Sequence, residues 1–159
     1  MRITIACVGR LKERYWKEAA AEYVKRLSRY AQTEVLETDD ESVPERLSDA
    51  QRVSAIAKEG DRLLAFVQPR DIVIALCIDG KRLTSEGFAK EIDGGFATGA
   101  PRIVFVIGGS LGLSPAVTSR ANIRLSLSDM TFPHQLARVL LLEQIYRAFK
   151  ILNNETYHK

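Results

Sequence analysis

Apolar residues follow two alternating patterns along this chain. Runs rich in β-branched residues, typical of buried parallel strands, predict strands at 3–9, 34–37, 71–79, 102–109 and 123–128. Apolar residues spaced by three and four predict helices at 14–28, before about residue 66, and at 85–96, 114–121 and 134–150. Asp79-Gly80 predicts a turn. This alternation predicts one α/β domain over 1–159, with a mostly parallel sheet flanked by helices.

Ligands of parallel sheets bind beyond the carboxyl ends of the strands, here residues 76–80, 107–112 and 127–132. Gly108, Gly109 and Gly112 follow a strand and precede the helix start at Ser114-Pro115, so backbone can approach a ligand closely. The segment lacks the pattern of a P-loop or of GxGxxG, which argues against nucleoside triphosphate and standard dinucleotide sites. An ordinary tight turn would also need these glycines.

The loop LSDMTFPHQ offers a thioether at Met130, a hydroxyl at Thr131 and an aromatic ring at Phe132. Such a loop is suited to wrap an adenosine, and it equally suits an ordinary strand-to-helix connection. His134 opens the next helix, a position more typical of a capping-turn residue than of a catalyst.

The last predicted helix has an apolar arc of roughly 200°, about twice what cover on one side requires. It is therefore expected to be covered by its own sheet and by a second subunit, as in a homodimer. Arg138 lies within this arc and, if buried, needs an anionic or hydrogen-bonding partner. A functional role for Arg138 would explain its position among apolar residues. A side chain that snorkels to the surface at the helix end would explain it equally. Glu143 is expected to pair with Arg147 rather than to act as a base.

The chain ends in Tyr157, His158 and Lys159. An aromatic ring beside a titratable imidazole is suited to stacking a base and handling a proton. Fraying of an irrelevant terminus is the competing interpretation.

Charge is distributed unevenly although the net charge is only +3. Residues 1–30 carry eight Lys or Arg against three Asp or Glu, residues 31–71 carry five against ten, and residues 101–159 carry seven against three. A basic surface built from both ends would bind a polyanion such as RNA in a salt-dependent way. Solvated helix faces would produce the same distribution.

Hydrophobic residues make up 46% of the chain and charged residues 27%, as in one ordinary globular domain. No apolar stretch approaches the roughly 18 residues of a membrane span, and the N-terminus does not resemble a signal peptide. We therefore expect a cytoplasmic protein without a membrane partner. Cys7 and Cys77 lie in apolar runs and no Cys/His cluster has zinc spacing, so no metal is expected.

Four segments together resemble one known family: ITIACVGRLKERYWKEAAAEYVKRL, VFVIGGSLGLSP, LSLSDMTFPHQLARVLLLEQIYRAFKI and the terminal TYHK. They resemble the RlmH family, bacterial methyltransferases of large-subunit ribosomal RNA in the SPOUT superfamily. The resemblance covers essentially the whole chain, with no departure in the glycine loop, the MTFPHQ loop or the terminal Tyr-His.

The resemblance implies a deep C-terminal trefoil knot, over approximately 72–159, which is a rare exception to unknotted topology. It implies a homodimer that binds S-adenosylmethionine, releases S-adenosylhomocysteine, and methylates N3 of a pseudouridine in 23S rRNA on assembled ribosomes, with no DNA partner. The implied cofactor-binding residues are Leu76, Gly108, Leu127, Ser128, Asp129, Met130, Thr131 and Phe132.

Methyl transfer from a sulfonium is an in-line displacement, and the pseudouridine N3–H must first lose its proton. We assign the proton acceptor to His158, with His134 as the second candidate. Arg138 would hold the anionic base or its phosphate, and Tyr157 would position the ring.

Three alternatives differ in function class. The first is a SPOUT methyltransferase of another RNA, such as transfer RNA. The second is a non-catalytic ribosome-binding or assembly factor that has lost the cofactor. A nicotinamide or flavin enzyme is disfavoured because GxGxxG and the acidic ribose-binding residue are both missing.

Overall fold

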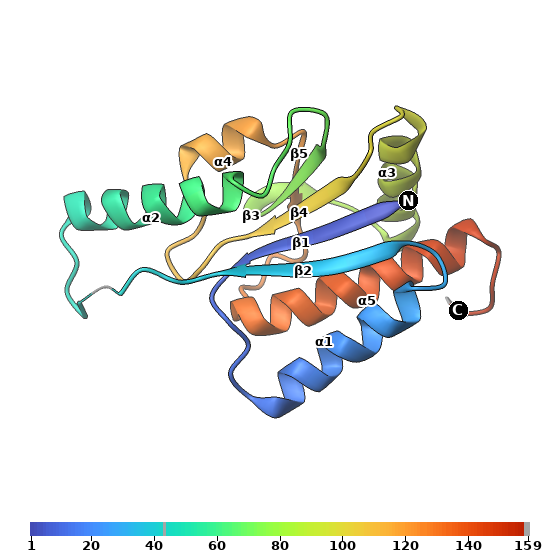
Figure 1. Cartoon of the computed structure of the whole chain (residues 1–159), viewed down its shortest axis with the longest axis horizontal. Helices are drawn as coiled ribbons and strands as arrows, with labels where there is room; N and C mark the ends of the chain where they lie inside the picture. The colour runs from blue at the N-terminus through green and yellow to red at the C-terminus, as the bar shows by residue number, and fades with distance from the viewer. Residues whose placement is uncertain (43, 158–159) are drawn as a thin grey trace.

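The protein folds as a five-stranded parallel sheet with helices on both faces (Figure 1). The structure is a computed structural model that describes residues 1–42 and 44–157. The strands lie in the order β2-β1-β4-β3-β5. Along the chain the elements are β1 (Arg2–Val8), α1 (Arg14–Leu27), β2 (Gln32–Thr38), α2 (Asp49–Leu64), β3 (Ile72–Arg82), α3 (Ser85–Ala97), β4 (Ile103–Ile107), α4 (Pro115–Arg120), β5 (Ile123–Ser126) and α5 (His134–Leu152).

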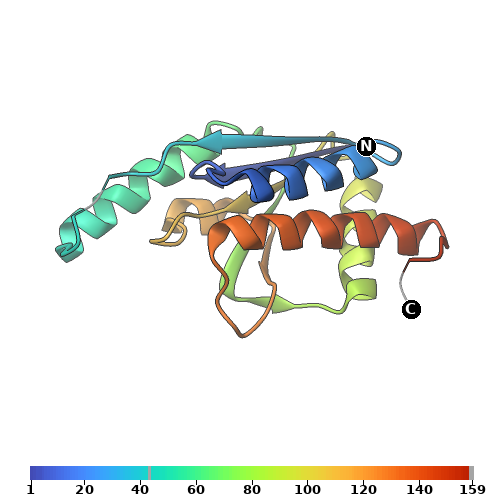
Figure 2. The ribbon, with the colours of Figure 1, turned by 90° about the horizontal axis from the view of Figure 1, so that it is seen from below.

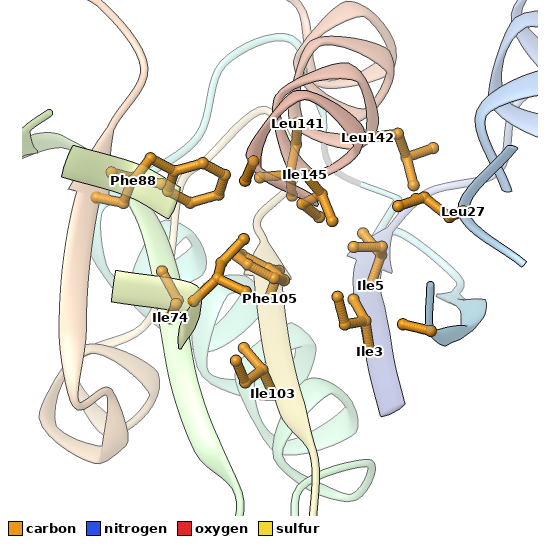
Figure 3. Packing of buried hydrophobic residues seen from close by; sticks show 14 of the residues in the cluster. Ile3, Ile5, Leu27, Ile74, Phe88, Ile103, Phe105, Leu141, Leu142 and Ile145 are labelled. Atoms are coloured by element: carbon orange, nitrogen blue, oxygen red, sulfur yellow. The ribbon is translucent and has the colours of Figure 1, made fainter. Parts of the chain in front are cut away.

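The central strands are buried on both faces, which explains their continuous apolar runs. On β1, Ile3 and Ile5 join the cluster under α1, α3 and α5, whereas Ala6 and Val8 join the cluster under α2 and α4. Figure 2, which views the molecule from below, shows α1 and α5 side by side on the same face of the sheet. In Figure 3, side chains of β1, β4 and α5 meet in the larger cluster.

The predicted turn at Asp79-Gly80 is wrong, because β3 continues to Arg82. Leu125 of β5 pairs first with Leu76 and again with Lys81, so the residues between them form an irregularity in β3. A Cβ atom on Gly80 would lie 2.6 Å from the carbonyl carbon of Leu125. Glycine is therefore required for the close approach of two backbones.

The other predicted strands and helices are present, with bounds that shift by a few residues. Ser114 caps α4 as predicted, since its Oγ accepts from the Val117 N–H and Pro115 occupies the first turn. The α/β class with a parallel sheet flanked by helices is confirmed. The trefoil knot stays a prediction.

A buried ion pair lies at the amino end of β4. The Arg102 Nη2 atom is 2.6 Å from Asp71 Oδ2 and also donates to the Phe66 carbonyl at 2.7 Å. The Gln68 N–H donates to the same Asp71 carboxylate at 2.7 Å. Burial would raise the Asp71 pKa, but the bonds from Arg102 and Gln68 outweigh it and hold that pKa below its ordinary value of 3.8.

Replacing Asp71 by asparagine should lower the free energy of unfolding by about 3 kcal/mol at neutral pH, because Arg102 loses its buried counter-charge. The Asp71 pKa is lower in the folded protein than in the unfolded chain. The stabilisation is therefore fully present at pH values above the ordinary pKa of 3.8, and it is lost as the pH falls through the lowered pKa of the folded protein. Urea unfolding across this range should show the difference between wild type and Asp71→Asn shrinking in acid. Glu18→Gln, which breaks only an exposed pair with Arg14, is the control and should change little.

Candidate active site

A pocket of about 770 Å³ opens at the carboxyl ends of β4 and β5, beside residues 76–78 of β3 and the start of α5. Its lining includes residues of all three segments that the sequence predicts as a ligand site, although the first of them lies within β3 rather than in a loop. Its lining consists of 76–78, 107–113, 125–128, 130–134 and Ala137.

The glycine loop brings backbone to the pocket wall. Gly112 has φ +89°, which favours glycine, and its N–H donates to the Gly109 carbonyl at 3.1 Å. A Cβ atom on Gly108 would lie 2.6 Å from the Gly112 carbonyl oxygen. A side chain at Gly108 would therefore break this tight turn and alter the shape of the pocket.

The loop between β5 and α5 forms the opposite wall. Ser126 Oγ donates to the Ser128 carbonyl and Ser128 Oγ accepts from the Met130 N–H, both at 3.0 Å, so the loop is held by its own polar groups. Met130 is 73% exposed and Ile78, which also lines the pocket, is 72% exposed. Apolar walls with a few hydroxyl and backbone groups are typical of small-molecule sites.

Seven of the eight predicted cofactor-binding residues line this pocket: Leu76, Gly108, Leu127, Ser128, Met130, Thr131 and Phe132. The eighth, Asp129, is not among the lining residues, and its carboxylate lies 2.8 Å from Arg82 Nη1 at the surface. Their binding role stays a prediction. Cys77, which the sequence analysis interprets only as a residue of an apolar run, also lines the pocket, and so do Leu125 and Pro133, which lie outside the three predicted strand-end segments.

His134 lines the pocket and lies against Gly9 at the end of β1. A Cβ atom on Gly9 would be 3.3 Å from His134 Nε2, and Gly9 has φ +80°. Burial lowers the His134 pKa, as does the positive charge of Arg138, while Asp40 opposes them. His134 is therefore neutral near pH 7 and able to accept a proton.

Arg138 is buried within the apolar arc of α5, so it does not snorkel to the surface, and it has the anionic partner that burial requires. Its Nη1 atom pairs with Glu37 Oε1 and its Nη2 atom donates to the Gly9 carbonyl at 3.0 Å. Arg138 is not among the residues that line the pocket. Its role toward the substrate stays a prediction.

Tyr157 packs against the middle of its own α5, whereas the pocket lies at the start of that helix. Its hydroxyl donates to Glu143 Oε1 at 3.1 Å, and its ring meets Tyr146 edge-on with centroids 5.0 Å apart. Burial, together with the charge of Glu143, raises the Tyr157 pKa to about 12. The predicted Glu143–Arg147 pair is present at 2.6 Å. His158 lies outside the described residues.

Among residues 1–42 and 44–157, no cluster of three or more His, Cys, Asp or Glu side chains could hold a metal ion. None of the helices in these ranges is long and apolar enough to span a membrane.

A family model described as "Predicted SPOUT methyltransferase" matches residues 1–158. The chain therefore belongs to the SPOUT methyltransferase family. Ribosomal RNA large subunit methyltransferase H of Carboxydothermus hydrogenoformans is 55% identical over 159 residues, which span the full length of both chains.

Two solved structures share the fold. A probable methylase family protein from Haemophilus influenzae Rd KW20 has a TM-score of 0.55 at 15% identity, covering 99% of this chain and 70% of that chain. Lpg2936 of Legionella pneumophila, solved with bound SAM, has a TM-score of 0.51 at 11% identity. That match covers 94% of this chain and 66% of the other.

Proposed function

We propose that the protein transfers a methyl group from S-adenosylmethionine to N3 of a pseudouridine in 23S rRNA on assembled ribosomes. The observation that carries this proposal is 55% identity to a ribosomal RNA large subunit methyltransferase over the full length of both chains. The described pocket, at the predicted strand ends, supports it independently.

The residues of the pocket fit the proposed cofactor. The backbone at Gly108 has no room for a Cβ atom, so the glycine loop presents bare backbone to a ligand. The apolar walls and the hydroxyl groups of the pocket suit an adenosine. We assign adenosine and methionine contacts to Leu76, Gly108 and 127–132, with Asp129 contributing through its backbone because its carboxylate faces Arg82.

When bound, the cofactor supplies an electrophilic methyl group on its sulfonium. We assign the acceptance of the N3 proton to His134, and its place in the pocket lining and its lowered pKa support that assignment. His158 remains the other acceptor, with Tyr157 positioning the base. Arg138 acts on the anionic substrate only if its bond with Glu37 rearranges. In the described arrangement it donates to the carbonyl of Gly9, the residue against which His134 lies.

We propose a cytoplasmic homodimer in which each chain is one SPOUT domain over 1–159, knotted within approximately 72–159. Leu136, Val139 and Leu140 of α5 are only half-buried in the single chain, which supports cover by a second copy. Because Tyr157 lies along α5 and away from its own pocket, a second copy would bring another tail to the site.

Tritium transfer from labelled S-adenosylmethionine tests this function, with ribosomes from a strain that lacks the gene. Label should appear in the large-subunit RNA of assembled ribosomes and be absent from free transfer RNA. Label in transfer RNA would overturn the proposed substrate. No label with any RNA would favour the non-catalytic ribosome-binding or assembly factor.

The His134→Ala variant should lower kcat about a hundredfold if His134 is the acceptor, within the range of general base catalysis. S-adenosylhomocysteine affinity, measured by calorimetry, should stay within a few-fold of wild type. Unchanged kcat in this variant, with loss of kcat on deletion of the last three residues, would move the role to the tail.

A further inference from the structure

Glu59 is a buried carboxylate directly behind the pocket. It lies near the end of α2, is 4% exposed, and its Oε1 accepts from the Glu41 N–H at 2.9 Å. Its Oε2 is buried without a hydrogen-bond partner. That oxygen faces the glycine loop, since a Cβ atom on Gly109 would lie 3.3 Å from it.

Helix α2 also lies in close contact with the end of this loop. A Cβ atom on Gly60 would lie 2.1 Å from Ser114 Oγ, so the helix and the end of the loop touch through a glycine. Gly109 lines the pocket, and because it has no side chain, the Glu59 carboxylate lies directly against its backbone. The Glu59 carboxylate therefore lies close to the backbone of a residue that lines the pocket.

No acidic side chain is among the residues that line the described pocket. The proposed methyl donor carries one more positive charge than its product, because methyl transfer converts the sulfonium into a neutral thioether. A cation in an apolar pocket is stabilised by a nearby anion, and poorly solvated charges interact more strongly than charges in water.

We infer that Glu59 is a specificity-determining residue that favours the cationic methyl donor over the neutral product by its charge behind Gly109. This inference rests on the proposed function. It also explains why an unpaired carboxylate oxygen is kept beneath a loop that consists of glycine, serine and aliphatic residues.

The ionisation of Glu59 should control this preference. Burial raises its pKa above the ordinary 4.5, the Glu41 N–H lowers it, Asp40 and Glu41 raise it, and Arg62 lowers it. As pH falls through this raised value, Glu59 becomes neutral and the preference for the donor should shrink. Among the described residues that line the pocket, His134 is the histidine and also titrates as pH falls, so the pH series is made in the His134→Asn background.

The test compares affinities for S-adenosylmethionine and S-adenosylhomocysteine by calorimetry on the full chain. In Glu59→Gln, the donor-to-product affinity ratio should fall about threefold to tenfold, the size of a partly screened charge effect. The matched control is Asp61→Asn, which removes the same charge from an exposed position of α2 and should leave the ratio unchanged.

Equal weakening of both ligands in Glu59→Gln would overturn the inference, because it would show a packing role only. An unchanged ratio would overturn it as well. If Glu59→Gln does not fold, the pH series on the chain that retains Glu59 decides, and a flat ratio overturns the inference. Failure of the wild type to bind either ligand would instead overturn the proposed function.

Discussion

The Gly80→Ala variant should lose about 3 kcal/mol or more of its free energy of unfolding, the largest effect we expect from one added methyl group. A Cβ atom there would lie 2.6 Å from the Leu125 carbonyl carbon and 2.8 Å from that of Arg124. Both obstacles are backbone, so neither can move aside as a flexible side chain would. Because Leu125 lines the pocket, the variant should also weaken cofactor binding.

Urea unfolding followed by circular dichroism measures the first effect, and calorimetry with S-adenosylhomocysteine measures the second. Gly94→Ala is the matched control, because a Cβ atom on this exposed glycine of α3 meets nothing within 4 Å. It should be neutral, or stabilise by up to about 1 kcal/mol through helix propensity. Equal stability of the two variants would contradict the close approach of β3 and β5.

Replacing Glu37 by alanine should destabilise the protein by about 3–5 kcal/mol, more than replacing Arg138 by methionine. The reason is unequal burial, since the Arg138 side chain is 1% exposed and that of Glu37 is 31% exposed. Without Glu37 the guanidinium stays buried and keeps its bond to the Gly9 carbonyl, but it loses its anionic partner. Without Arg138, water can reach the carboxylate of Glu37.

A double-mutant cycle measured by urea unfolding tests this asymmetry. The Glu37→Ala/Arg138→Met double variant should be more stable than Glu37→Ala alone, because it no longer buries an unpaired charge. If Arg138→Met costs as much as Glu37→Ala, the pair is not governed by the burial of the guanidinium.

The sequence predicts α5 and the position of Arg138 well, because helical periodicity places the guanidinium among apolar neighbours. It does not predict Glu37 as the partner, since the two residues are 101 positions apart and only the sheet and α5 bring them together. Glu59 is missed for a similar reason. Nothing in its local sequence shows that the glycine loop covers it.

The Asp79-Gly80 error has a different cause. Asp-Gly is a turn signal when local propensity decides the conformation, but here β5 passes so close that only glycine fits. The same residue type satisfies both requirements, and local sequence does not distinguish them. The pocket loops were predictable because strand ends in a parallel sheet share one edge.

The parallel arrangement of the sheet also sets the order in which the chain can fold. The β1–α1–β2 unit is local, but Ile3 of β1 pairs on its other side with Ile103 of β4, one hundred residues later. During synthesis, the edge of β1 that pairs with β4 therefore remains unpaired until most of the chain has left the ribosome. Such long-range pairing makes folding slow and exposes the nascent chain to aggregation.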